Sequence, residues 1–243
     1  MTHRTRLTSR LRLGASAALL LALLPLSSSV RTPRARTSVA SSGALGRPLA
    51  APASKRAEIR RQLASRSRGT YIGEMLTERD SALARWPDLG GEPLRVWVQP
   101  ASLIEGWTPS YVTEVRSAFQ QWDALLLPVR FAFTVDSATA DVHVTFVDHF
   151  DEEISGRTKW ARDDHWWITD ADIVLAVYHR EGPMLDDDAM HAMSLHEIGH
   201  LLGLDHTRDS TSIMASKVRV RSLSAADRAT VRLLYTLPPG GVR

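Results

Sequence analysis

The sequence predicts an α/β (α+β) domain, because strand-like and helix-like segments follow one another along residues 94–236. Short runs with apolar residues at every second position are typical of strands, and longer runs with apolar residues three or four positions apart are typical of helices. The chain has 243 residues, of which 44% are hydrophobic and 23% are charged. This balance favours a folded globular domain over a disordered chain.

The elements are expected in the following order. Residues 94–98 (LRVWV) alternate between apolar and polar residues and predict the first strand. A helix is expected from Thr108-Pro109, because proline is favoured in the first helical turn. Its apolar stripe is Tyr111, Val112, Val115, Ala118, Phe119 and Trp122. Further strands are expected at about 129–135, 141–147, 156–161 and 171–177. Two more helices are expected at about 188–203 and 224–236.

Residues 196–206 read HEIGHLLGLDH and place His196 and His200 four positions apart. Residues at this spacing lie on the same face of an α-helix, so both imidazoles can reach one metal ion. Gly203 can adopt the left-handed conformation that ends a helix, after which the chain turns back and presents His206 as a third nitrogen ligand. Three protein ligands with one open position are typical of catalytic zinc, whereas structural zinc sites have four protein ligands.

Glu197 directly follows the first histidine, so its side chain leaves the helix in a different direction from the two histidine side chains. We expect it to act as a general base that takes a proton from the zinc-bound water and passes it to the leaving nitrogen. Zinc held by neutral imidazoles lowers the pKa of its bound water towards about 7 and polarises a carbonyl group. The motif therefore predicts peptide-bond hydrolysis without a covalent intermediate. The alternative is an amphipathic core helix with solvated histidines.

These residues resemble the metzincin clan of zinc peptidases and, within it, the matrixins in a bacterial-style, single-domain secreted form. The clan carries a methionine in a tight turn after the long histidine motif, and Met214 stands at that place. Thr207, directly after the third histidine, is similar to the serine or threonine of matrixins. The resemblance implies a metzincin fold with a twisted, mostly parallel five-stranded sheet, an active-site helix and a C-terminal helix.

The segment 223–235 (LSAADRATVRLLY) is similar to the closing helix of matrixins. Asp227 matches the aspartate that braces the methionine turn in that family. Asp227 is the second aspartate of the matrixin pair. Matrixins use the first to hold the N-terminal ammonium after activation, and Ala226 replaces it here. The chain has no cysteine, so it also lacks the cysteine that keeps many matrixin proenzymes inactive. The resemblance covers about residues 94–237.

The N-terminal residues have the pattern of a secretory signal peptide. Four arginines within the first twelve residues precede an apolar run from Leu13 to Leu26. This run is shorter than the roughly 20 residues that a membrane-spanning helix needs. We therefore expect residues 1–29 to be a cleaved signal peptide, with an uncleaved membrane anchor as the alternative. The mature protein is then expected to be secreted, extracellular or periplasmic, without stable membrane insertion.

Basic residues crowd the first part of the chain, where Glu58 is the only acid before residue 69. Although the whole chain has a net charge of +3, the part after residue 68 is therefore acidic. An acidic domain does not favour nucleic-acid binding. We expect residues 30–68 to form a basic flexible linker or pro-segment, residues 69–237 the peptidase domain and residues 238–243 a tail. The expected partners are protein or peptide substrates, and the protein is expected to be a monomer.

The polar region after residue 148 leaves three alternatives open: a second, structural zinc site, a calcium site, or solvated loops. Matrixins bind a structural zinc through a His-x-Asp pair and two later histidines, and a similar order occurs at His149, Asp151, His165 and His179. Glu74 is either a surface carboxylate or a cap on the catalytic zinc, as a short aspartate motif is in astacins.

The function has alternatives as well. The chain could be a processing peptidase dedicated to one partner protein, or a non-catalytic zinc-binding or adhesion domain. Glu197 argues against the second alternative, because metal binding alone does not require it. In matrixins the substrate pairs with an edge strand above the zinc, and residues 156–161 are the expected strand.

Overall fold

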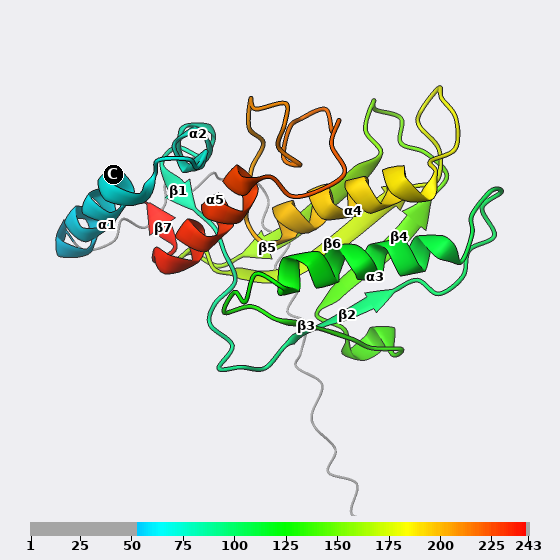
Figure 1. The fold of residues 1–243 in the computed structure, drawn as a ribbon. Coiled ribbons are helices and arrows are strands. Elements are labelled where there is room, and N and C mark those ends of the chain that lie inside the picture. The colour runs from blue at the N-terminus through cyan, green and yellow to red at the C-terminus, as the bar shows by residue number, and fades with distance from the viewer. Residues whose placement is uncertain (1–52, 242–243) are drawn as a thin grey trace, which may run out of the picture. The chain divides into compact units, whose positions relative to one another are not determined.

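A five-stranded sheet forms the centre of the domain (Figure 1). In sheet order its strands are β3 (Phe131–Phe133), β2 (Leu94–Val98), β4 (Val142–Val147), β6 (Ile168–Ala176) and β5 (Gly156–Arg162). The first four strands are parallel, whereas β5 is an edge strand antiparallel to β6. The expected mostly parallel five-stranded sheet is therefore confirmed.

The structure is a computed structural model in which residues 53–241 are described. The predicted signal peptide, residues 1–29, lies outside the described residues, as do residues 30–52 of the predicted linker. Across residues 53–241, no helix has the length and apolar character needed to cross a membrane.

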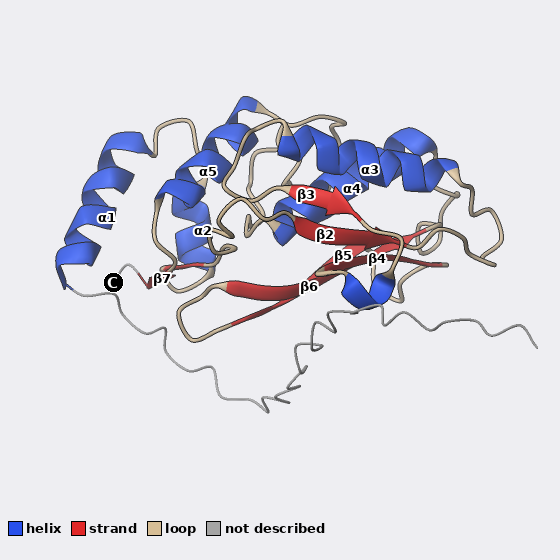
Figure 2. Cartoon of the chain, turned by 90° about the horizontal axis from the view of Figure 1, so that it is seen from below, coloured by secondary structure: helices blue, strands red, loops and turns tan. Residues whose placement is uncertain are grey.

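Two helices, α3 (Ser110–Asp123) and α4 (Asp187–Leu201), pack against each other on one face of the sheet (Figure 2). Helix α4 also contacts β5 and β6. It begins after Asp186, whose side chain accepts a hydrogen bond from the Ala189 amide at 2.7 Å and so caps the helix. Helix α3 buries five of the six residues of the predicted stripe, namely Tyr111, Val115, Ala118, Phe119 and Trp122. The sixth, Val112, is partly buried against the same core.

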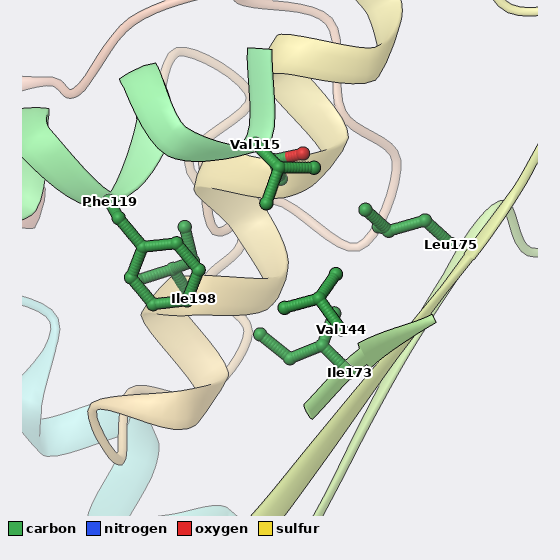
Figure 3. A pocket seen from close by; sticks show the side chains of 7 residues that line it. Val115, Phe119, Val144, Ile173, Leu175 and Ile198 are labelled. Atoms are coloured by element: carbon green, nitrogen blue, oxygen red, sulfur yellow. The ribbon is translucent and has the colours of Figure 1, made fainter. Parts of the chain in front are cut away.

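Apolar side chains fill the space between these two helices and the sheet (Figure 3). The labelled side chains come from α3, α4, β4 and β6: Val115, Phe119, Ile198, Val144, Ile173 and Leu175. The gap between them is too small to hold a water molecule. Such close packing fixes α4 against the sheet, and α4 carries the first part of the histidine motif.

Helix α5 (Ala225–Thr236) follows a long loop and closes the domain. Its N-cap is Ser224, whose hydroxyl accepts the Asp227 amide at 3.1 Å, while the Asp227 carboxylate accepts the Ser224 amide at 2.7 Å. This reciprocal capping box satisfies two amides that would otherwise lack a partner at the start of the helix.

Several short elements were not predicted from the sequence. They are α2 (Ile72–Glu78), β1 (Ala82–Leu83), the 3-10 helix η1 (Ser137–Thr139) and β7 (Gly240–Gly241), while α1 (Ala53–Arg66) lies in the predicted linker. Strand β1 pairs antiparallel with β7. Part of the segment expected as a tail, residues 238–243, is therefore paired. The sequence did not predict this strand because two residues are too few to show a periodic pattern.

Residues 71–86, called the 71–86 segment below, are tied to both α4 and α5. The Trp86 indole donates a hydrogen bond to the Leu201 carbonyl at 2.9 Å. The Tyr71 amide donates to the Thr230 hydroxyl at 3.1 Å. The segment is thus fixed beside the helix that carries the histidine motif, although it precedes the first strand of the main sheet.

Candidate metal centre

Three imidazoles converge at the end of α4 and in the turn after it. The Nε2 atoms of His196 and His200 are 3.1 Å apart, those of His200 and His206 are 3.2 Å apart, and those of His206 and His196 are 3.3 Å apart. Nitrogen ligands of a tetrahedral zinc, at about 2.0–2.1 Å from the metal, lie roughly 3.3 Å from each other. Among residues 53–241, this is the one group of three or more metal-ligating side chains whose ligand atoms lie within 4.8 Å.

Hydrogen bonds on the far side of two imidazoles fix which nitrogen faces the centre. Nδ1 of His196 is 2.7 Å from the Ile213 carbonyl, and Nδ1 of His200 is 3.0 Å from the Leu204 carbonyl. A carbonyl can only accept, so each Nδ1 carries the proton and each Nε2 presents a lone pair. Two lone pairs that face each other at 3.1 Å repel unless a cation lies between them. The donor set therefore fits a metal ion such as zinc.

The environment also favours the neutral, ligating form of these histidines. Burial lowers the pKa of His196 to about 4, and the bond to the Ile213 carbonyl only partly opposes this. Burial and the neighbouring histidines lower the pKa of His200 well below its ordinary value. Neutral imidazoles are the form that binds a metal ion.

The Glu197 side chain is enclosed between α4 and the edge strand β5. Its carboxylate accepts a hydrogen bond from the Thr158 hydroxyl at 2.6 Å. Gly156 lies against the same carboxylate, since a Cβ atom there would be 2.4 Å from Glu197 Oε1. Only 3% of Glu197 is exposed. Burial raises the pKa of Glu197 to about 7, and the hydrogen bond from Thr158 opposes this rise.

Met214 packs directly against α4 at Gly199. A Cβ atom at Gly199 would lie 2.3 Å from the Met214 sulfur, so a glycine is needed for this close approach. The methionine is fully buried. The preceding residue, Ile213, supplies the carbonyl that orients His196. One tight turn thus carries both the methionine and a group that positions the first histidine.

Asp227 of α5 holds that turn in place. Its buried carboxylate accepts hydrogen bonds from the Ser212 hydroxyl and from the Ile213 amide at 3.1 Å. It also accepts the Ser224 amide at 2.7 Å and the Tyr71 hydroxyl at 3.3 Å. Four donors offset the cost of removing a carboxylate from water.

Gly203 ends α4 in the left-handed conformation, with a φ of +96°. Its amide donates to the His200 carbonyl at 2.9 Å. A Cβ atom at this position would lie 2.2 Å from the Ala84 carbonyl oxygen. The glycine therefore turns the chain towards His206 and allows the 71–86 segment to pack closely against the turn.

A family model described as matrixin matches residues 107–236, which is more than half of the chain. The chain belongs to the matrixin family. It is 24% identical to Metalloendoproteinase 1 of Glycine max over 151 residues, which cover 54% of this chain and 47% of that protein. It is 30% identical to Metalloendoproteinase 1-MMP of Arabidopsis thaliana over 143 residues, which cover 51% of this chain and 37% of that protein. The chain thus spans less than half the length of these curated relatives.

The residues considered for a second metal ion in this matrixin do not form a cluster of three ligands within residues 53–241. His179 Nδ1 is 2.7 Å from the Ser155 hydroxyl. His149 pairs with the adjacent Asp148, and the side chain of His165 is 71% exposed. A structural zinc or calcium ion is therefore not indicated by this arrangement of side chains.

Two polar residues beside the matrixin metal centre, Thr158 and Arg79, were not predicted as site residues. Thr158 shares a strand face with Gly156, and alternation along the expected edge strand is the signal that could have identified it. Arg79 carries no comparable signal, because its partners lie more than 120 residues away. Glu74 does not cap the metal ligands: its carboxylate accepts the Arg208 amide at 2.9 Å.

Proposed function

We propose that this matrixin is a zinc-dependent endopeptidase that hydrolyses protein or peptide substrates, with Glu197 as the general base. The observation that carries the proposal is the convergence of His196, His200 and His206 through their Nε2 atoms. Membership of the matrixin family and similarity to two plant metalloendoproteinases support the same reaction class.

The three histidines would hold the ion and leave one coordination position open. When bound, zinc supplies Lewis acidity that acidifies a water molecule and polarises the scissile carbonyl. Glu197 takes a proton from the attacking water as the new C–O bond forms, and it delivers that proton to the leaving nitrogen as the C–N bond breaks. The Thr158 hydroxyl keeps the Glu197 carboxylate in one orientation for both transfers.

The supporting side chains have separate roles in this proposal. Met214 packs under α4 at Gly199, and Asp227 fixes the turn that carries Met214. Gly203 turns the chain so that His206 reaches the other two histidines. All three act on the geometry of the metal ligands and none is assigned to proton transfer.

Strand β5 is proposed to bind the substrate. It pairs with β6 along one side only and is one of the two edge strands of the sheet. An extended peptide can add to such an edge through backbone hydrogen bonds. The Glu197 carboxylate lies against two residues of this strand, Gly156 and Thr158. A peptide along β5 would therefore pass close to the catalytic base.

We further propose that the protein is secreted, to the extracellular space or a periplasm, after removal of residues 1–29, and that it acts as a monomer. Residues 30–68 would be a basic linker or pro-segment, residues 69–237 the peptidase domain and residues 238–243 a terminal extension. The arginine-rich start followed by an apolar run supports this division.

Cleavage of a mixed peptide library by the purified protein with zinc, beside Glu197→Ala, tests the function. Both the full chain and a chain that begins at Gly69 are assayed, so that inhibition by the upstream segment is detected. Cleavage by the wild type that is lost in Glu197→Ala, with zinc bound to both, is the expected result. Zinc binding without cleavage by either wild-type chain would overturn the peptidase and favour a zinc-binding or adhesion domain.

A further inference from the structure

The guanidinium of Arg79 binds the turn between the second and third histidines, although Arg79 lies upstream of the residues that the matrixin model matches. Its Nη1 donates to the Gly203 carbonyl at 2.9 Å, and its Nη2 donates to the Leu204 carbonyl at 3.3 Å. Its Nε is 2.6 Å from Asp205 Oδ2. One side chain therefore holds three consecutive residues of the histidine motif.

Two of these three residues also hold the metal-binding histidines. The Leu204 carbonyl, which Arg79 binds, accepts the Nδ1 proton of His200 at 3.0 Å. The Asp205 carboxylate, which Arg79 pairs with, accepts the backbone amide of His206 at 3.3 Å. Arg79 thus acts on His200 through a carbonyl and on His206 through a carboxylate. Partners of this kind orient ligands, and their loss typically weakens metal binding about 10–100-fold.

The surroundings of Arg79 distinguish this contact from an ordinary surface ion pair. The side chain of Arg79 is 13% exposed and that of Asp205 is 23% exposed. The Arg79 Cζ atom lies 5.3 Å from the centre of the Trp160 ring on the edge strand β5. A planar guanidinium can serve two carbonyls and a carboxylate together, whereas a lysine ammonium lacks this fixed fork. The site therefore requires arginine in particular.

We propose that Arg79 is a positioning residue of the metal centre, which raises zinc affinity by fixing the turn from Gly203 to Asp205. The proposal rests on the proposed function only in taking the three histidines as zinc ligands. It follows that the metal-binding unit includes the 71–86 segment and is larger than the part matched by the family model.

Zinc affinity is measured by competition with a chromogenic chelator for the full chain and for Arg79→Met. Methionine keeps an apolar stem of similar length but removes the charge and all three donors. Arg85→Met is the matched control. Arg85 lies in the same segment, donates to the Leu237 and Trp86 carbonyls at 2.9 and 3.0 Å, and packs over the rings of Trp167 and Tyr235.

The free energy of unfolding of each metal-free protein is measured by urea denaturation alongside the zinc affinity. We expect Arg79→Met to bind zinc about 10–100-fold more weakly than the wild type. We expect Arg85→Met to lose stability but to keep wild-type zinc affinity. Because Arg79→Met can fail to fold, Arg79→Lys carries the same test: it keeps the ion pair with Asp205 and is expected to recover only part of the affinity.

Two results would overturn the role of Arg79. One is wild-type zinc affinity in both Arg79 variants, and the other is an equal loss of affinity in Arg85→Met, which would point to general destabilisation. Failure of the proposed function is recognised separately. Wild-type protein that binds zinc but cleaves no peptide would end the peptidase proposal. A lower zinc affinity in Arg79→Met than in Arg85→Met would still support the positioning role of Arg79.

Discussion

The Thr158 hydroxyl donates to the Glu197 carboxylate at 2.6 Å and so joins the edge strand of the sheet to the helix that bears the first two histidines. The same hydroxyl oxygen lies 2.9 Å from the Glu197 backbone carbonyl. With Glu197 only 3% exposed, water cannot readily replace this donor. The orientation of the proposed base therefore depends on a residue that belongs to the proposed substrate-binding strand.

Thr158→Val removes the hydroxyl with little change of shape. A hydrogen bond to a charged group contributes about 1.5–3 kcal/mol, so we expect kcat to fall roughly 10–100-fold while KM changes little. Thr158→Ser restores a hydroxyl and should recover most of the activity. Steady-state kinetics on a fluorogenic peptide, with zinc content measured for each variant, provides the test. A valine variant with wild-type kcat would show that Glu197 does not need this bond.

Gly156→Ala places a methyl group where the structure leaves no room, since its Cβ would lie 2.4 Å from Glu197 Oε1. Either the carboxylate or strand β5 must shift. A displacement of about 1 Å at a catalytic group costs on the order of 100-fold in rate, and that is the expected loss of kcat. Gly73→Ala is the control, because a Cβ there meets nothing within 4 Å. Equal kcat for both alanine variants would refute the steric argument.

Asp227→Asn tests the brace on the methionine turn. The asparagine side chain offers one acceptor oxygen, and its amide group would face donors that now point at a carboxylate. We expect a loss of about 3 kcal/mol in the free energy of unfolding, measured by urea denaturation. Asp123→Asn removes a carboxylate from a partly exposed pair with Arg130 and should cost less than about 1 kcal/mol. Similar losses of unfolding free energy in the two variants would contradict the role of Asp227 as the brace of the methionine turn.

Removal of zinc should lower the melting temperature, because the facing lone pairs of His196 and His200 then lose the cation that offsets their repulsion. At a free zinc concentration about 1,000 times Kd, binding stabilises the native state by roughly 4 kcal/mol. Calorimetry with and without a chelator measures this effect. Glu197→Ala keeps the ligands and should show a similar shift, whereas His200→Ala should show little. A melting temperature that stays the same when the chelator is added would argue against the three-histidine site.

Much of the sheet could be predicted because its pattern is local. In β2 and β4 every second residue is buried, and a single sequence shows this alternation directly. The site histidines could be predicted for a related reason. The spacing of His196 and His200 within one helix fixes their relative positions, whatever the rest of the chain does.

The remaining features depend on contacts between distant residues. Tyr71 and Asp227 are 156 positions apart, and Arg79 and Leu204 are 125 positions apart. Helix α2 has seven residues and β1 has two, so neither shows a recognisable period. These elements are stabilised by tertiary contacts, not by their own sequence preference. The alternation along β5 places Thr158 on the same strand face as Gly156, but its partner Glu197 is fixed only when β5 packs on α4.

The pairing of Ala82 with Gly241 and of Leu83 with Gly240 joins the two flanks of the domain through backbone hydrogen bonds. Arg79 stands three residues before this ladder. Proteolytic removal of Gly240 and Gly241 would therefore leave β1, which follows Arg79, without its pairing strand. We expect the C-terminal truncation to lower the zinc affinity of the three histidines through Arg79.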